Sequence, residues 1–293
     1  MQNLIWRHIG IRLPDEWEML LYSSQLESGR CVFADRYQHR LEMSWQIVPG
    51  PPDFSWMMKN YAERLGAKSS GDTSHEGTAD IRMLDVDGWH GLVCADNVIS
   101  SRFGKYISEE HCLVELVFLW ENRRDKTLER TILNSVDLQK KDQDGLRQWR
   151  AFGMDIHVSD RLPLARCAVL PASAQMVFRD GKKPDCEEKF ERLGFVSEWL
   201  QVSLEQWLQQ RTPRDISGMT HETTRIKNHE FVILRGHKSM PGISRLLGRH
   251  IDYQSIAWIC PHDNRLYCQT SLGSQPTFVP LRLQCCPEVE VDA

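Results

Sequence analysis

The succession of hydrophobic and polar residues occurs twice along the chain. In the first half, alternation at Leu41–Trp45 predicts a strand, and Asp53, after two prolines, predicts the start of a helix. The apolar residues of that helix share one face, namely Phe54, Met57, Met58, Tyr61 and Leu65. In the second half, residues 186–190 correspond to the strand. A second helical stripe precedes Pro213 and consists of Val196, Trp199, Leu200, Leu204, Trp207 and Leu208.

Short sequence matches favour the same interpretation. Trp6–Ile11 resembles Trp149–Met154 in the pattern Trp-Arg-x-apolar-Gly-apolar, and residues 31–35 resemble residues 176–180. Trp120 matches Trp258, each at the end of an apolar segment. Landmarks in the same order predict an internal duplication. The matched tryptophans are then expected at equivalent core positions, namely Trp6 with Trp149, Trp56 with Trp207 and Trp120 with Trp258.

The predicted fold class is α+β, with two tandem related domains. Each domain is expected to be a mostly antiparallel sheet packed with a few helices. The first domain covers residues 1–138 and ends in an amphipathic helix at Asp125–Val136. A polar run at residues 139–146 is the expected linker, and residues 147–293 form a second, diverged domain without a clear closing helix.

Two polar stretches follow the predicted helices, Lys68–Ala79 in the first domain and Thr212–Thr224 in the second. Because neither has a hydrophobic face, both are expected to be loops. In this interpretation they close over a partner segment, held in a groove between sheet and loop of each domain or between the two domains.

Charge and composition exclude several classes of protein. Lys and Arg number 36 and Asp and Glu 40, so the net charge is −4, whereas nucleic-acid binders are usually basic. No signal peptide or membrane-length apolar run is present in the sequence, so a cytoplasmic location without membrane association is expected. Nine cysteines, an odd number, are then expected to be mostly reduced thiols.

The sequence contains none of the common phosphate-binding, dinucleotide-binding, zinc-protease or serine-hydrolase motifs. One segment does carry candidate chemistry. Cys260, His262 and Cys268 surround a predicted hairpin tip at Asp263–Asn264, and the two cysteines are placed symmetrically about Asn264. Thiolate and imidazole are preferred zinc ligands, and Cys285 or Cys286 would supply a fourth. Two alternatives remain open, a pair of buried thiols with an exposed histidine and a redox pair.

Two segments carry a resemblance to a known family. The opening Ile11–Trp17 is an extended segment that breaks at proline before tryptophan, and Arg130–Val136 ends the predicted helix of the first domain. Both resemble the superfamily that contains the photosystem subunit PsbP and the bacterial DcrB proteins. The second half has Ser159–Pro163 in place of the opening. The resemblance implies α+β domains with non-enzymatic binding or adaptor roles.

Duplication without catalytic motifs therefore predicts a bacterial-type, non-enzymatic binding or adaptor protein, with a chaperone-like role toward a protein partner. No cofactor other than zinc is expected. The alternative is a metal- or thiol-dependent enzyme centred on Cys260, His262 and Cys268.

Overall fold

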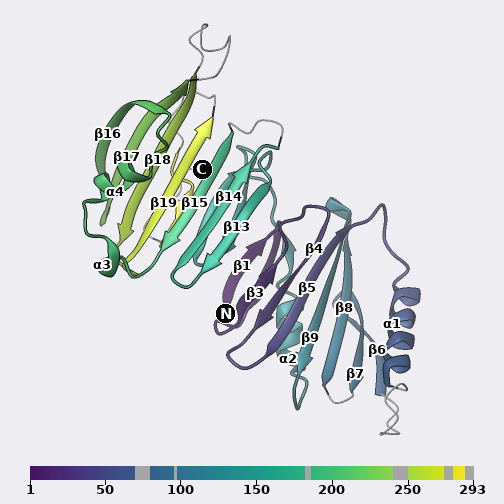
Figure 1. The fold of residues 1–293 in the computed structure, drawn as a ribbon. Helices are drawn as coiled ribbons and strands as arrows, with labels where there is room; N and C mark the ends of the chain where they lie inside the picture. The colour runs from purple at the N-terminus through teal and green to yellow at the C-terminus, as the bar shows by residue number, and fades with distance from the viewer. Residues whose placement is uncertain (70–79, 96–97, 182–185, 240–249, 274–279, 288–293) are drawn as a thin grey trace. The chain divides into compact units, whose positions relative to one another are not determined.

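The computed structural model describes residues 1–69, 80–95, 98–181, 186–239, 250–273 and 280–287. It divides into two compact units (Figure 1). Unit 1 consists of Met1–Leu4 and Ile9–Asp137, and unit 2 of Ile5–His8 and Leu138–Ala293. The described residues are mostly β and form three antiparallel sheets, so the α+β prediction is wrong. The helical stripes are real, but most of the hydrophobic core lies on strands.

Unit 1 contains a seven-stranded sheet in the order β3-β4-β5-β9-β8-β7-β6, in which every neighbouring pair is antiparallel. One face is dominated by fully buried aromatic residues such as Phe103 and Phe118. The strands are β3 (Glu18–Tyr22), β4 (Ser28–Ala34), β5 (His39–Ile47), β6 (Asp80–Val86), β7 (Trp89–Ala95), β8 (Ile99–Ile107) and β9 (Cys112–Trp120).

Two helices accompany this sheet. Helix α1 (Phe54–Ser69) begins at the predicted cap, where Asp53 accepts a hydrogen bond from the Trp56 amide at 3.0 Å, and it packs along β7. Helix α2 (Lys126–Leu133) is the predicted closing helix and is capped by Asp125. The remaining elements assigned mainly to unit 1 are β1 (Gln2–Trp6), β2 (Ile9–Leu13), η1 (Ser108–Glu110) and β10 (Asp137–Leu138).

Unit 2 has a seven-stranded sheet with the same order of strands, β13-β14-β15-β19-β18-β17-β16, again antiparallel throughout. The sheet is therefore repeated. Its strands are β13 (Leu164–Leu170), β14 (Ser173–Arg179), β15 (Glu187–Leu193), β16 (Ile216–Ile226), β17 (His229–Ser239), β18 (His250–Cys260) and β19 (Arg265–Gly273).

Each face of the unit 2 sheet is covered differently. Helices α3 (Val196–Trp199) and α4 (Leu204–Arg211) cover one face, where Trp207 packs with Val232, Ala257 and Cys268. The other face meets a smaller layer, in which β11 (Leu146–Ala151) pairs with β12 (Met154–Ser159) and β12 with β20 (Leu283–Gln284). Trp149 of this layer contacts Phe178 of the sheet, ring centre to ring centre 5.2 Å.

Three local predictions need correction. Residues 212–224 are not a loop, because most of them belong to β16, whose side chains are exposed on both faces; the other predicted loop lies largely in 70–79, outside the described residues. The second helical stripe forms two short helices rather than one. The matched tryptophans do not all occupy equivalent core positions. In chain order Trp120 ends the seventh strand of its seven-stranded sheet whereas Trp258 lies in the sixth strand of the other, and Trp56 is 66% exposed.

His8 makes the stability of unit 2 depend on pH. Burial, followed by the positive charges of Arg147 and Arg7, lowers the pKa of His8 to about 3. The folded unit therefore binds a proton less readily than the unfolded chain, in which histidine titrates near pH 6.5. His8 contributes its full stability above pH 6.5, and this contribution is lost as the pH falls from 6.5 toward 3.

Between pH 7 and pH 5 we expect the free energy of unfolding to fall less in the His8→Asn variant than in the parent. The two losses should differ by roughly 1–2 kcal/mol, measured by urea denaturation at both pH values. Asparagine suits this position because His8 has a positive φ of 72°. Parallel pH profiles for the two proteins would contradict this prediction.

A candidate metal centre in unit 2

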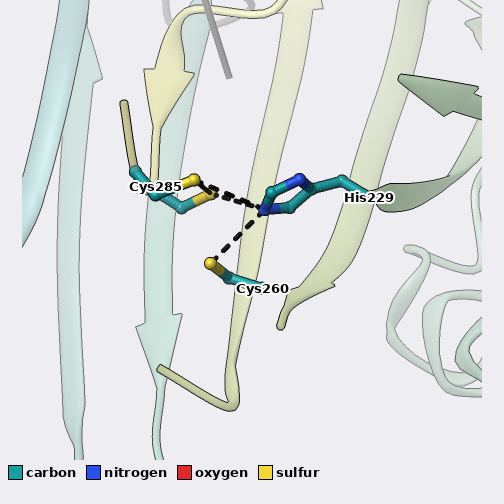
Figure 2. Close-up of side chains that lie close together, drawn as sticks. His229, Cys260 and Cys285 are labelled. Carbon is teal, nitrogen blue, oxygen red and sulfur yellow. Dashed lines mark hydrogen bonds between the residues drawn. The ribbon is translucent and has the colours of Figure 1, made fainter. Parts of the chain in front are cut away.

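Four side chains of unit 2 bring one nitrogen and three sulfur atoms together. The ligand atoms of His229, Cys260, Cys285 and Cys286 all lie within 4.8 Å of one another. Figure 2 shows the side chains of His229, Cys260 and Cys285 pointing toward a common centre. His229 and Cys260 are fully buried, while Cys285 and Cys286 are half-buried.

Strand register brings the first two residues together. His229 is the first residue of β17, directly after a two-residue turn in which Lys227 has a left-handed backbone, as hairpins of this type require. Phe231 pairs with Trp258 across β17 and β18. Continuing this register by two residues places His229 opposite Cys260, the last residue of β18.

The other two ligands come from the segment Pro280–Pro287, which lies on the same unit. Leu283 is fully buried, and it pairs with Ile156 where β20 meets β12. The Arg282 amide donates to Gln269 Oε1 at 2.8 Å, and the Arg282 guanidinium pairs with the buried Glu188. These contacts fix the chain immediately before Cys285 and Cys286.

Four of the six distances between ligand atoms match a tetrahedral metal site, and the other two, from Cys260 Sγ to the sulfurs of Cys285 and Cys286, are at most 4.8 Å. His229 Nε2 lies 3.4 Å from Cys260 Sγ, 3.5 Å from Cys285 Sγ and 3.5 Å from Cys286 Sγ. The sulfurs of the two adjacent cysteines are 3.8 Å apart. Around a tetrahedral zinc ion with ordinary bond lengths, a nitrogen and a sulfur are about 3.6 Å apart and two sulfurs about 3.8 Å apart.

Hydrogen bonds alone would satisfy this arrangement poorly. One imidazole nitrogen either donates one hydrogen or accepts at one lone pair, yet three sulfurs converge on it. A disulfide between the adjacent cysteines would require about 2.05 Å between sulfurs, far less than the 3.8 Å observed. Burial raises the pKa of both Cys260 and Cys285, so a bound cation would be needed to hold them as thiolates near neutral pH.

The structure combines the predicted residues differently from the sequence. The hairpin tip is present, but Cys260 pairs with Arg265, and Cys268 pairs with Ala257. Cys268 therefore lies on the helix-covered face, near Ser255 at 3.6 Å, and takes no part in the cluster. The ring of His262 is 6.0 Å from that of His229, outside the group of four ligand atoms.

His229 is the residue that the sequence analysis missed, because it lies 31 residues before Cys260 and on a different strand. His229 begins β17 directly after a hairpin turn, as Trp89 begins β7 in unit 1, but this correspondence rests on strands that only the structure reveals.

Comparisons with known proteins add little. No protein-family model and no curated protein matches the chain. One similar solved structure is the apo form of TplEi, an immunity protein of T6SS from Pseudomonas aeruginosa, with 9% identity and a TM-score of 0.36 over 99% of this chain and 90% of that one. TplEi complexed with "L" peptide gives 8% identity and a TM-score of 0.32, over 94% and 88% respectively.

Likeness at this level carries no inference about the present chain. The resemblance to PsbP and DcrB proteins stays a prediction. Among the described residues, no helix combines the length and apolar character that a membrane crossing requires.

Proposed function

We propose that unit 2 binds one zinc ion through His229, Cys260, Cys285 and Cys286, and that this zinc has a structural role. The observation that carries the proposal is the agreement between four of the six ligand distances and the edges of a zinc tetrahedron. Three thiolates and one imidazole are also a common ligand set for structural zinc.

The same ligand set argues against the enzyme alternative. Catalytic zinc keeps one position open for water or substrate, whereas four protein ligands close the tetrahedron. We therefore propose a non-enzymatic binding protein in which zinc holds the C-terminal segment on the sheet. None of the nine cysteines, all of which lie among the described residues, forms a disulfide, in agreement with a reducing compartment such as the cytoplasm.

The proposal includes a protein as the partner that is bound. Large apolar side chains are exposed near the β13–β14 turn and helix α3, with Leu170 67% and Phe195 71% exposed. The turn and the residue before Phe195 are in contact, because the Gly194 amide donates to Ala172 O at 2.6 Å. Exposed apolar clusters of this kind favour protein contacts. Metal-dependent turnover of a small substrate would contradict the non-enzymatic role.

We expect the protein, reduced and metal-free, to bind one equivalent of Co²⁺, the spectroscopic substitute for zinc, with the absorption of a four-coordinate thiolate site. Cys260→Ser and His229→Ala should each weaken binding strongly, because each removes one of four ligands. Cys268→Ser is the matched control, because it changes a buried thiol of the same sheet outside the cluster.

Added azide tests whether the site is closed. An unchanged Co²⁺ spectrum supports four protein ligands, and a new azide-dependent band would reveal an open position and favour the enzyme. Loss of Co²⁺ binding in Cys268→Ser, with His229→Ala unaffected, would show that the proposed ligand set is incorrect.

A further inference from the structure

We infer that Trp258 is a positioning residue of the metal centre, which orients Cys285 and stabilises its thiolate toward the metal. The inference rests on the proposed zinc site and deepens it. Trp258 Nε1 donates to Cys285 Sγ over 3.2 Å. The indole is fully buried, so this contact lies away from solvent.

The sheet holds the indole in one orientation. Trp258 lies two residues before Cys260 on β18, and therefore on the same face of the sheet. It pairs with Phe231 on one side and with Tyr267 on the other, with ring centres 5.0 and 5.7 Å away. Tyr267 is fixed in turn, because its hydroxyl donates to Asp263 Oδ2 at 2.7 Å.

The indole hydrogen bond favours the thiolate of Cys285 over its thiol. An indole N–H can donate a hydrogen bond but cannot accept one, so its best partner is a negatively charged sulfur. Groups that hydrogen-bond a metal ligand orient it and tune its basicity, and losing one typically costs 10–100-fold in metal affinity. Cys285 needs this support because it belongs to a short segment rather than to the seven-stranded sheet.

The test compares Trp258→Phe with the parent protein by competitive zinc titration. We expect the dissociation constant to rise about 10–100-fold. In the Co²⁺-loaded protein the sulfur-to-metal charge-transfer band should shift, because one thiolate loses its hydrogen bond. Trp149→Phe is the control, since Trp149 is also buried in unit 2 but contacts Trp6 and Phe178 instead of the cluster.

A second measurement needs no variant. With ¹⁵N-labelled tryptophan and ¹¹³Cd²⁺ in place of zinc, the indole N–H of Trp258 should show coupling to cadmium through the sulfur, whereas the other indoles should not. If the parent protein binds neither zinc nor cadmium, the proposed function itself fails. If it binds them but Trp258→Phe retains parental affinity and spectrum, or if no indole couples to cadmium, the role of Trp258 alone is refuted.

Discussion

Removing zinc from the metal-loaded protein with a chelator is expected to destabilise unit 2 by about 4 kcal/mol when zinc had been present at 1,000 times its dissociation constant. Metal that binds only the folded state contributes its binding free energy to folding. Hydrogen exchange followed by mass spectrometry should show lost protection in β17, β18 and the segment 280–287. The seven-stranded sheet of unit 1 should keep its protection, because it contributes no ligand.

Two variants of the protein serve as controls for direct effects of the chelator. His229→Ala should resemble the chelated parent with or without metal, whereas Cys268→Ser should respond to chelation as the parent does. Equal loss of protection in the sheets of both units, or none in either, would contradict a structural metal at this place.

A comparison of the two units gives a physical reason why unit 2 would need a metal and unit 1 would not. In unit 1, the chain that follows the last strand of the sheet forms α2, whose Ile132 and Leu133 are fully buried. Trp89 lies against its end, where the indole Nε1 donates to Leu133 O at 3.2 Å. Burial of apolar surface therefore contributes to holding that closing segment in place.

In unit 2, the corresponding closing segment is Pro280–Pro287, which forms one two-residue strand and no helix among its described residues. It buries Leu281 and Leu283 but has little other apolar surface. His229 stands at the position of Trp89, at the start of the same strand of the repeat. A metal joining His229 and Cys260 to Cys285 and Cys286 would supply the stability that a short segment lacks.

The sequence predicts part of this site and not the rest, because strand register decides which side chains meet. The hairpin at residues 260–268 is visible from its turn residues, and so is Cys260 as a candidate ligand. Symmetry about Asn264 suggested that Cys260 faces Cys268, but the four-residue turn pairs Cys260 with Arg265 instead. This register leaves Cys268 on the opposite face of the sheet.

The prediction of the fold class from the sequence is limited for a related reason. The stripe at Phe54–Leu65 correctly predicts a helix, and the helix at Lys126–Leu133 is also visible from its cap and stripe. Strand β16 is invisible because it is an edge strand exposed on both faces, and therefore lacks the alternation that marks a half-buried strand. Such a strand is specified by its pairing with β17, which single-sequence patterns do not contain.

In unit 1, Glu129→Ala is expected to destabilise the fold by about 3–5 kcal/mol, the usual cost of breaking a buried ion pair by removing one partner. Glu129 is 1% exposed. Its carboxylate accepts from Trp120 Nε1 at 2.7 Å and Arg124 Nε at 2.7 Å, and also from the Ser101 hydroxyl. Truncation leaves all three donors without this acceptor, and the Arg124 charge is largely buried.

Urea denaturation measures the loss, and two further variants separate charge from packing. Glu121→Ala removes an exposed carboxylate of the same region and should change the free energy of unfolding by less than about 0.5 kcal/mol. Combining Glu129→Leu with Arg124→Met replaces the ion pair by apolar groups and should recover much of the loss, because no unpaired charge is then buried. A loss below about 1 kcal/mol in Glu129→Ala would mean that water or another acceptor replaces the carboxylate, and that Glu129 does not fix α2 to the sheet.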